Sequence, residues 1–158
     1  MSLVKGYFVT GTDTEVGKTL VSGALILKLR AAGMKALGFK PVAAGCYQDA
    51  QGRRLNEDVE TLRIASNLEH DKLDLCPYLL DMAAAPHLAA EKQQLHLNLE
   101  TITKSYEEVC RHGDLVIVEG AGGFLIPLNA QEGLDDLAQN LDLPIIMVVG
   151  MRLGCINP

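Results

Sequence analysis

The sequence is poor in basic residues and contains no long hydrophobic segment. Its 14 Lys and Arg residues are outnumbered by 20 Asp and Glu residues, which gives a formal net charge of −6. Because the basic residues are few and scattered, the composition argues against a nucleic-acid-binding surface. No apolar stretch approaches the roughly 18 residues that a membrane span needs, and the N-terminus has no signal-peptide pattern. We therefore expect a cytoplasmic protein with neither nucleic-acid nor membrane partners.

The cysteines and histidines lack the spacing of a disulfide framework or a metal site. The four cysteines are far apart and form no C-x-x-C pair, a pattern that fits reduced thiols in the cytosol. The four histidines likewise show no metal-ligand spacing, so each is interpreted as a surface or packing residue. The chain also lacks internal repeats, low-complexity segments and interdomain linkers. With 158 residues, of which 48% are apolar, it is long enough for a single domain with a hydrophobic core.

Apolar runs alternate with amphipathic segments along the chain, which predicts an α/β fold. This alternation is typical of a mostly parallel sheet flanked by helices on both faces, as in P-loop NTPases. In the first helix we expect an apolar stripe. Its centre is formed by Leu20, Ala24, Leu27 and Ala31, and it is widened by Val21, Leu25 and Leu29. Residues 43–56 are interpreted as a loop. The predicted strands cover about 4–10, 35–40, 115–118 and 144–149, and the predicted helices about 18–32, 57–67, 86–93, 99–112 and 134–141.

Residues 11–19, Gly-Thr-Asp-Thr-Glu-Val-Gly-Lys-Thr, lie between the first predicted strand and the first predicted helix. Glycine lets the backbone approach a phosphate closely, and the helix N-terminus presents N–H groups to it. Lys18 can reach the β- and γ-phosphates, and the Thr19 hydroxyl can bind Mg²⁺. Thr12 occupies the place of the glycine in G-x-x-x-x-G-K-[ST], so the interpretation depends on Gly17-Lys18-Thr19 and on their context. The segment predicts binding of a nucleoside triphosphate.

Charged residues and glycines follow the other predicted strands. Lys40 follows the second strand, Glu119 and the glycine-rich segment 120–123 follow the central strand, and Gly150 follows the last one. Because ligands gather at the carboxyl ends of the strands in such sheets, these residues are expected to lie at one edge. A carboxylate there would lose hydration without compensation unless a ligand needs it. Since Mg²⁺ prefers oxygen ligands, Glu119 is interpreted as a magnesium ligand. The alternative is a solvated carboxylate at the tip of a strand.

Other acidic residues leave two interpretations open. Asp58 could bind a metal, or it could be a first-turn acid that the helix dipole favours after the expected cap Asn56. Lys40 is either a functional cation beside the phosphate loop or a solvated charge. Asp13 and Glu15 would repel a triphosphate, which hints at a second ligand with amine character.

Taken together, these motifs resemble the dethiobiotin synthetase family, whose members are the ATP-dependent ring-closing enzymes of biotin synthesis. The resemblance covers the whole chain, and the sequence of the phosphate loop, which includes Glu15, is its most specific part. The matching motifs are Gly11-Thr12-Asp13-Thr14-Glu15-Val16-Gly17-Lys18-Thr19, Gly38-Phe39-Lys40-Pro41-Val42, Asn56-Glu57-Asp58, Pro86-His87, Val118-Glu119-Gly120-Ala121-Gly122-Gly123 and Leu153-Gly154-Cys155-Ile156-Asn157.

The resemblance implies that ATP and CO₂ convert 7,8-diaminopelargonic acid into dethiobiotin, with Lys18 and Lys40 as catalytic cations. It implies Mg²⁺ ligation by Thr19, Asp58 and Glu119, and a homodimer in which the segment around Gly154 completes the partner's active site. The implied nucleotide-binding residues are Thr14, Glu15, Val16, Gly17, Lys18, Thr19, Asp58, Glu119 and Gly122. The implied substrate-binding residues are Thr14, Lys40, Gly122, Gly154, Cys155 and Asn157.

The chain departs from the family pattern in two places. Ala44 replaces a hydroxyl residue of the family, so one polar substrate contact is expected to be missing or supplied otherwise. The sequence stops at Pro158, where family members continue with segments that hold the adenine ring and part of the dimer contact. We therefore expect residues 1–158 to be a single P-loop nucleotide-binding domain that lacks the family's C-terminal portion.

Two other functions remain open at this level. One is a nucleotide-switch ATPase of the partitioning or metallochaperone kind. Such proteins usually carry an additional lysine near the start of the loop, and its absence here, together with Glu15, counts against them. The other is a catalytically inactive dethiobiotin-synthetase-like module.

Overall fold

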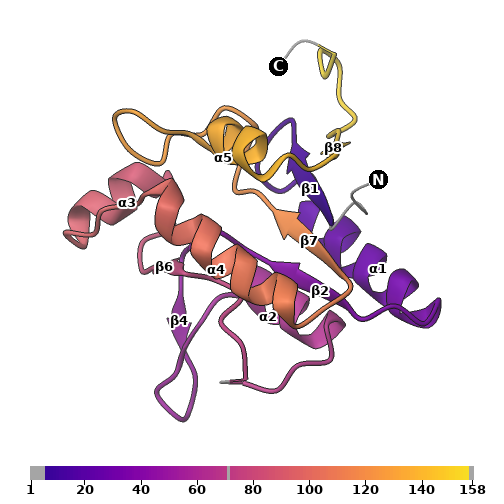
Figure 1. The fold of residues 1–158 in the computed structure, drawn as a ribbon. Helices are drawn as coiled ribbons and strands as arrows, with labels where there is room; N and C mark the ends of the chain where they lie inside the picture. Colours follow the sequence, from indigo (N-terminus) through magenta and orange to yellow (C-terminus); the bar gives the residue numbers. More distant parts are fainter. Residues whose placement is uncertain (1–5, 71, 157–158) are drawn as a thin grey trace.

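The central sheet has four parallel strands in the order β2-β7-β1-β8 (Figure 1). The structure is a computed structural model that describes residues 6–70 and 72–156. The predicted strand residues 4 and 5 lie outside the described part. The strands are β1 (Gly6–Gly11), β2 (Ala36–Phe39), β7 (Leu115–Glu119) and β8 (Ile145–Val148).

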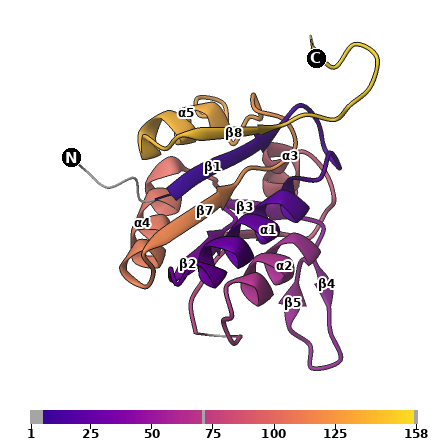
Figure 2. The same cartoon turned by 90° about the vertical axis from the view of Figure 1, so that its right-hand side faces the viewer.

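Helices cover both faces of this sheet, which confirms the predicted fold class (Figures 1 and 2). On one face, Ile26 and Leu62 pack against Val9 and Ile117. Side chains on the other face, which include Phe8 and Val118, join a separate core with residues of α4 and α5. The helices are α1 (Lys18–Ala31), α2 (Glu57–Ala65), α3 (Pro86–Lys92), α4 (Leu99–Arg111) and α5 (Leu134–Leu141). Along the described residues, no helix is both long enough and apolar enough to cross a membrane.

The predicted buried stripe of α1 is wrong at its centre, although Leu25 and Leu29 at its edge are partly buried and pack against the core. Leu20 and Leu27 are 76% and 58% exposed, whereas Ser22, Gly23 and Ile26 are buried. Ala24 and Ala31 are exposed as well. The phosphate loop fixes the rotation of the helix, because Lys18 begins it and must face the site. Small residues then permit close packing, since a Cβ at Gly23 would lie 3.4 Å from Thr61 of α2.

Residues 43–56 are not a simple loop, so that prediction is also wrong in part. Strand β3 (Val42–Ala44) pairs in parallel with β6 (Tyr78–Leu80), and β4 (Tyr47–Gln48) forms a hairpin with β5 (Arg54–Leu55). Asp49 builds the hairpin turn, because its Oδ1 accepts hydrogen bonds from the backbone N–H groups of Gln51 and Arg53. These short strands lie beside the carboxyl edge of the main sheet.

Candidate functional site

The phosphate loop joins β1 to α1 and lies at the carboxyl edge of the sheet. Gly17 directly precedes α1 with φ of 97°, a left-handed conformation that glycine adopts without strain. The Lys18 Nζ crosses the loop and donates a hydrogen bond to the Asp13 carbonyl oxygen at 2.7 Å. Burial lowers the pKa of Lys18, and the positive charge of Lys40 lowers it further. The loop thus holds a partly desolvated lysine beside the helix N-terminus.

Lys40 directly follows β2 and is 2% exposed. Its Nζ donates to Asp58 Oδ2 at 2.9 Å, to Glu119 Oε1 at 2.7 Å and to the Gly120 carbonyl at 3.2 Å. Burial lowers the pKa of Lys40, but the Glu119 and Asp58 carboxylates outweigh it and the pKa is raised overall. Lys40 is therefore a fixed positive charge between two acids.

Asp58 is placed by the first turn of α2. The expected cap is observed, since Asn56 Oδ1 accepts hydrogen bonds from the backbone N–H groups of Asp58 and Val59. Burial raises the pKa of Asp58, but the charge of Lys40 outweighs it and holds the pKa below its usual value. Asp58 is therefore ionised at neutral pH and lies in the first turn of α2, as one of the two interpretations expected. The other interpretation, metal binding by Asp58, stays a prediction.

The hydroxyl of Thr19 joins the two acids. Its Oγ1 lies 2.8 Å from Asp58 Oδ1 and 2.7 Å from Glu119 Oε1. A hydroxyl has one hydrogen and can donate to one of these oxygens at a time. Glu119 is fully buried, and its Oε2 has no hydrogen-bond partner among the described residues. Three oxygen groups, two of them charged, therefore meet here, as the expected Mg²⁺ ligation requires.

The described residues contain no cluster of three or more His, Cys, Asp or Glu side chains that could hold a metal. The oxygen set at this site has only two acids, and its third member is the Thr19 hydroxyl. It fits Mg²⁺, because Mg²⁺ is commonly bound by one or two carboxylates together with substrate phosphates and water.

A cavity of about 860 Å³ opens beside these groups. Of the predicted site residues, Thr14, Glu15, Gly17, Lys18, Thr19, Lys40, Asp58 and Gly122 line it. Ala44 also lines it and presents a methyl group where the family pattern has a hydroxyl. Val16 is absent from this lining, and a Cβ at Gly11 or Gly150 would lie under 3.0 Å from its side chain. Glu119 is buried behind Lys40 and Thr19.

Several residues of the cavity wall were not predicted as site residues. Five of them belong to the motifs that carry the family resemblance, although no role in the site was expected for them: Val42, Asn56, Glu57, Pro86 and Ala121. The others are mostly small residues, and some lie on short strands whose pairing the sequence did not reveal: Ala43, Gly45, Tyr47, Ala83, Ala84, Ala85 and Ile126. For residues 83–85, a usable signal was their position directly before the predicted helix at Pro86.

The segment after β8 does not reach this cavity within the same chain. Gly154 and Cys155 are absent from the cavity lining, and Asn157 lies outside the described residues. The segment instead contacts the outer side of the phosphate loop. The Gly150 N–H donates to Thr12 Oγ1 at 3.1 Å, and Arg152 pairs with Asp13 at 3.1 Å.

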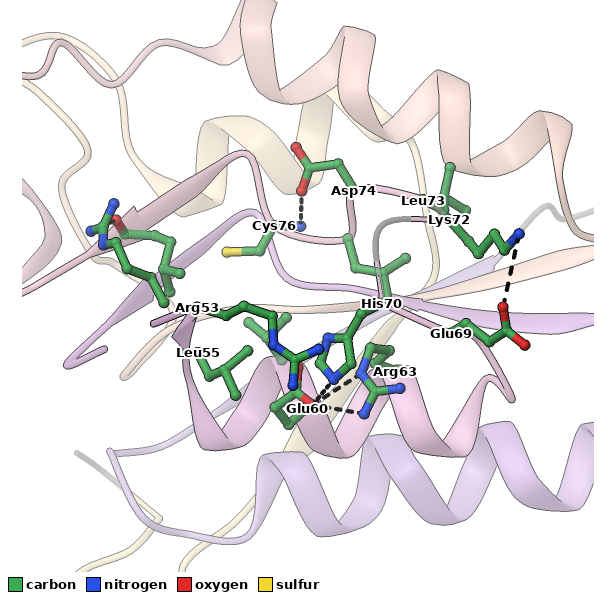
Figure 3. Close-up of a pocket in the computed structure, with 14 residues that line it drawn as sticks. Arg53, Leu55, Glu60, Arg63, Glu69, His70, Lys72, Leu73, Asp74 and Cys76 are labelled. Atoms are coloured by element: carbon green, nitrogen blue, oxygen red, sulfur yellow. Dashed lines mark hydrogen bonds and ion pairs between the residues drawn. The ribbon is translucent and has the colours of Figure 1, made fainter. Parts of the chain in front are cut away.

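A second cavity of about 660 Å³ lies beside α2 and contains none of the predicted site residues (Figure 3). Its cations already have partners: Arg63 contacts Glu60 at 2.7 Å, and Lys72 lies 3.8 Å from Glu69. Burial raises the pKa of the Cys76 thiol there to about 12, so the thiol is not ionised at neutral pH. This cavity is lined by mutually neutralised side chains, and the first cavity is the candidate active site.

Comparisons with known proteins show the family to which the chain belongs. A family model described as an AAA domain matches residues 5–158. A protein of Nitrosospira multiformis named ATP-dependent dethiobiotin synthetase BioD is 48% identical over 157 residues, which cover 99% of this chain and 67% of the relative. The chain belongs to the dethiobiotin synthetase family. A dethiobiotin synthetase BioD of Ralstonia nicotianae is 47% identical over 150 residues, which cover 95% of this chain and 65% of that protein.

The chain spans about two thirds of the length of these dethiobiotin synthetases. Among solved structures, the signal recognition particle receptor FtsY from Elizabethkingia anophelis matches with a TM-score of 0.51 and 19% identity. The match covers 94% of this chain and 42% of the receptor. At this identity the match supports the P-loop type of fold alone.

Proposed function

We propose that this chain carries the active site of an ATP-dependent dethiobiotin synthetase, which closes the ureido ring of dethiobiotin from 7,8-diaminopelargonic acid and CO₂. The observation that supports it most is the convergence of two lysines, a hydroxyl and two acids beside one cavity. Lys18 and Thr19 come from the phosphate loop, Lys40 from β2, Asp58 from α2 and Glu119 from β7. The reaction that we assign to this arrangement is inferred from the membership of the chain in the dethiobiotin synthetase family.

The first step forms a carbamate. One amine of the substrate attacks CO₂, a C–N bond forms and the amine loses a proton, which leaves a carbamate with a negative charge. Lys40 lines the cavity, and its ammonium group would hold this anion by exchanging its long hydrogen bond to the Gly120 carbonyl oxygen, at 3.2 Å, for one to the carbamate. Glu15 and Thr14 line the same cavity and would face the amine side of the substrate.

The second step transfers the γ-phosphoryl group of ATP to a carbamate oxygen. The new P–O bond forms as the bond to the β-phosphate oxygen breaks, and ADP leaves. Such a transfer depends on positioning and on charge neutralisation. The backbone of the loop around Val16 and Gly17 would hold the phosphates, and Lys18 would exchange its bond to the Asp13 carbonyl for one to the transferred group.

The third step closes the ring. The second amine attacks the carbonyl carbon of the mixed carbamic–phosphoric anhydride, phosphate leaves with its bridging oxygen, and the amine gives up a proton. Small residues such as Ala43, Ala44 and Ala84 line the cavity and leave room for an aliphatic substrate. Gly122 also lines the cavity, and a glycine there allows the backbone to approach the substrate closely.

Thr19, Asp58 and Glu119 would hold Mg²⁺, and the ion would neutralise phosphate charge during the transfer. The unpartnered Glu119 Oε2 supports this assignment, because a buried carboxylate oxygen normally has a partner. In the metal-free arrangement, Lys40 and the Thr19 hydroxyl compensate for the charge of Glu119 Oε1.

Residues 1–158 are proposed to form one P-loop nucleotide-binding domain of a cytoplasmic homodimer. Gly154, Cys155 and Asn157 would complete the active site of the partner subunit. This assignment is supported by the absence of Gly154 and Cys155 from the cavity lining of their own chain, and by the attachment of their segment to the phosphate loop through Thr12 and Asp13.

The test is dethiobiotin formation by the purified chain with ATP, Mg²⁺, bicarbonate and 7,8-diaminopelargonic acid, measured by mass spectrometry. Lys18→Ala should lower the rate by about 100-fold or more, the scale for losing one donor to developing charge. The matched control is Lys28→Ala, which removes an exposed lysine from the last turn of the same helix. A folded wild-type chain that forms no product, or equal rates in both variants, would contradict the proposal.

A further inference from the structure

The side chain of Asn56 connects two walls of the candidate active site. It is 7% exposed. Its Oδ1 accepts hydrogen bonds from the backbone N–H groups of Asp58 at 3.0 Å and Val59 at 3.3 Å. Its Nδ2 donates to the carbonyl oxygens of Ala44 at 3.1 Å and Gly45 at 3.4 Å. One amide group therefore joins the start of α2 to the end of β3.

The two joined segments carry different parts of the site. Asp58 binds Lys40 and the Thr19 hydroxyl, so the start of α2 places the charged groups. Ala44 and Gly45 belong to the wall of the cavity that would receive the substrate. Gly45 has a φ of 81°, and a Cβ there would lie 3.0 Å from the Cβ of Ala83 on the neighbouring wall segment. A small shift of this turn would therefore change the shape of the cavity.

Helix capping alone does not explain an asparagine at this position. Asn, Asp and Ser cap helices about equally well, since each provides a side-chain oxygen. Only the amide of Asn adds a donor that reaches the carbonyl groups of β3. Helix α4 provides the comparison: Asn98 caps it by accepting from the Thr101 N–H at 2.8 Å, and its Nδ2 lies 3.3 Å from the Tyr78 hydroxyl, with neither residue lining the cavity.

We propose that Asn56 is a positioning residue that sets the Asp58–Lys40 pair relative to the substrate wall at Ala44 and Gly45. The proposal deepens the proposed function and rests on it. Asn56 itself acts through its neighbours: its oxygen orients the backbone that carries Asp58, and its nitrogen holds the turn that shapes the cavity.

The decisive variant is Asn56→Asp, which keeps the capping oxygen and removes the donor. The added carboxylate oxygen would face the carbonyl oxygens of Ala44 and Gly45. Because all of these oxygens are hydrogen-bond acceptors, the two hydrogen bonds that connect residue 56 to the end of β3 would be lost. Helix α2 should still form, because a carboxylate at a helix N-terminus is favourable. Asn56→Ser is the second variant, since it keeps a capping oxygen without adding charge. Asn98→Asp and Asn98→Ser are the matched controls.

Steady-state kinetics of dethiobiotin formation give the main readout, with thermal unfolding measured on the same samples. Asn56→Asp should raise KM for the diamine and lower kcat, with kcat/KM reduced about 10- to 100-fold, the scale of a small misplacement of reacting groups. Asn98→Asp should leave both constants unchanged. If Asn56→Asp does not fold, Asn56→Ser is compared with Asn98→Ser in the same way.

Two results would overturn the inference. One is wild-type kcat and KM in the folded Asn56 variants. The other is an equal loss of activity in the Asn98 variants that follows a shared fall in unfolding temperature, since this would assign Asn56 to helix capping alone.

Failure of the proposed function has a separate signature. In that case the wild-type chain itself forms no dethiobiotin, and the Mg²⁺ dependence of binding to a fluorescent ATP analogue replaces the kinetic readout. Asn56→Asp should weaken this dependence through Asp58, whereas Asn98→Asp should not. Equal Mg²⁺ dependence in the two variants would overturn the role of Asn56 independently of the reaction.

Discussion

The fully buried Glu119 should make Lys40 necessary for stability as well as for chemistry. Lys40 Nζ lies 2.7 Å from Glu119 Oε1, and the two side chains are 3% and 0% exposed. Lys40→Met keeps most of the volume of the stem but removes the charge. Removing one partner of a buried ion pair costs about 3–5 kcal/mol, because the other charge is left uncompensated. We therefore expect Lys40→Met to lower the free energy of unfolding by that amount at pH 7.

Urea unfolding followed by circular dichroism measures this effect. With an m-value of about 2 kcal/mol per M, the midpoint should fall by about 1.5–2.5 M. The double variant Lys40→Met with Glu119→Gln should recover part of the loss, since it leaves no buried charge without a partner. Lys28→Met is the control at an exposed position on α1, where changes are usually within about 0.5 kcal/mol.

This role of Lys40 would be refuted if Lys40→Met lowered the free energy of unfolding by less than about 1 kcal/mol, the level of an exposed ion pair. It would also be refuted if the double variant were less stable than Lys40→Met, because Glu119 would then not be the group that needs the cation. Either result would mean that water or another cation compensates the charge of Glu119 in the folded chain.

Two further predictions concern ionisation. The pKa of Asp58 is held below its usual value in the folded chain, so the carboxylate stabilises the fold above the unfolded pKa and this contribution is lost as the pH falls below about 4. The free energy of unfolding of the wild-type chain, measured in urea, should therefore decrease more steeply on acidification than that of Asp58→Asn. The difference should be about 1 kcal/mol or less, because the Asp58 side chain is 42% exposed. Parallel pH profiles of the two proteins would contradict this prediction. The Cys76 thiol, with its pKa raised to about 12, should react with iodoacetamide at pH 8 about a thousand-fold more slowly than an ordinary thiol, as peptide mapping by mass spectrometry would record. Modification of Cys76 as fast as that of Cys155 would show that the pKa of the Cys76 thiol is not raised.

The sequence was sufficient to predict the parts of the site that depend on strand ends. Lys40 and Glu119 follow apolar strands, and the carboxyl ends of parallel strands meet at one edge, so their proximity followed from topology. Asn56 was recognised as a helix cap from its residue type and from the amphipathic segment behind it. These inferences needed only local patterns and one general rule about sheets.

The remaining features depend on tertiary packing that a local pattern does not contain. Helix α1 has apolar or small residues on every side, so periodicity could not show that Ser22 and Gly23 face the core while Leu20 is exposed. Strand β3 has three residues, and β4 and β5 have two each; such strands exist only through their pairing. The cavity wall around Ala83 was missed because it depends on β6, which the sequence did not reveal.

The measurement that tests the central claim most directly is the ratio of phosphate released to dethiobiotin formed by the wild-type chain. Phosphorylation of a carbamate at the Lys18–Lys40 site predicts one phosphate for each dethiobiotin. It also predicts that phosphate release stops when either the diamine or bicarbonate is omitted. Phosphate release at an undiminished rate without the diamine would contradict the account and would assign the site to simple ATP hydrolysis.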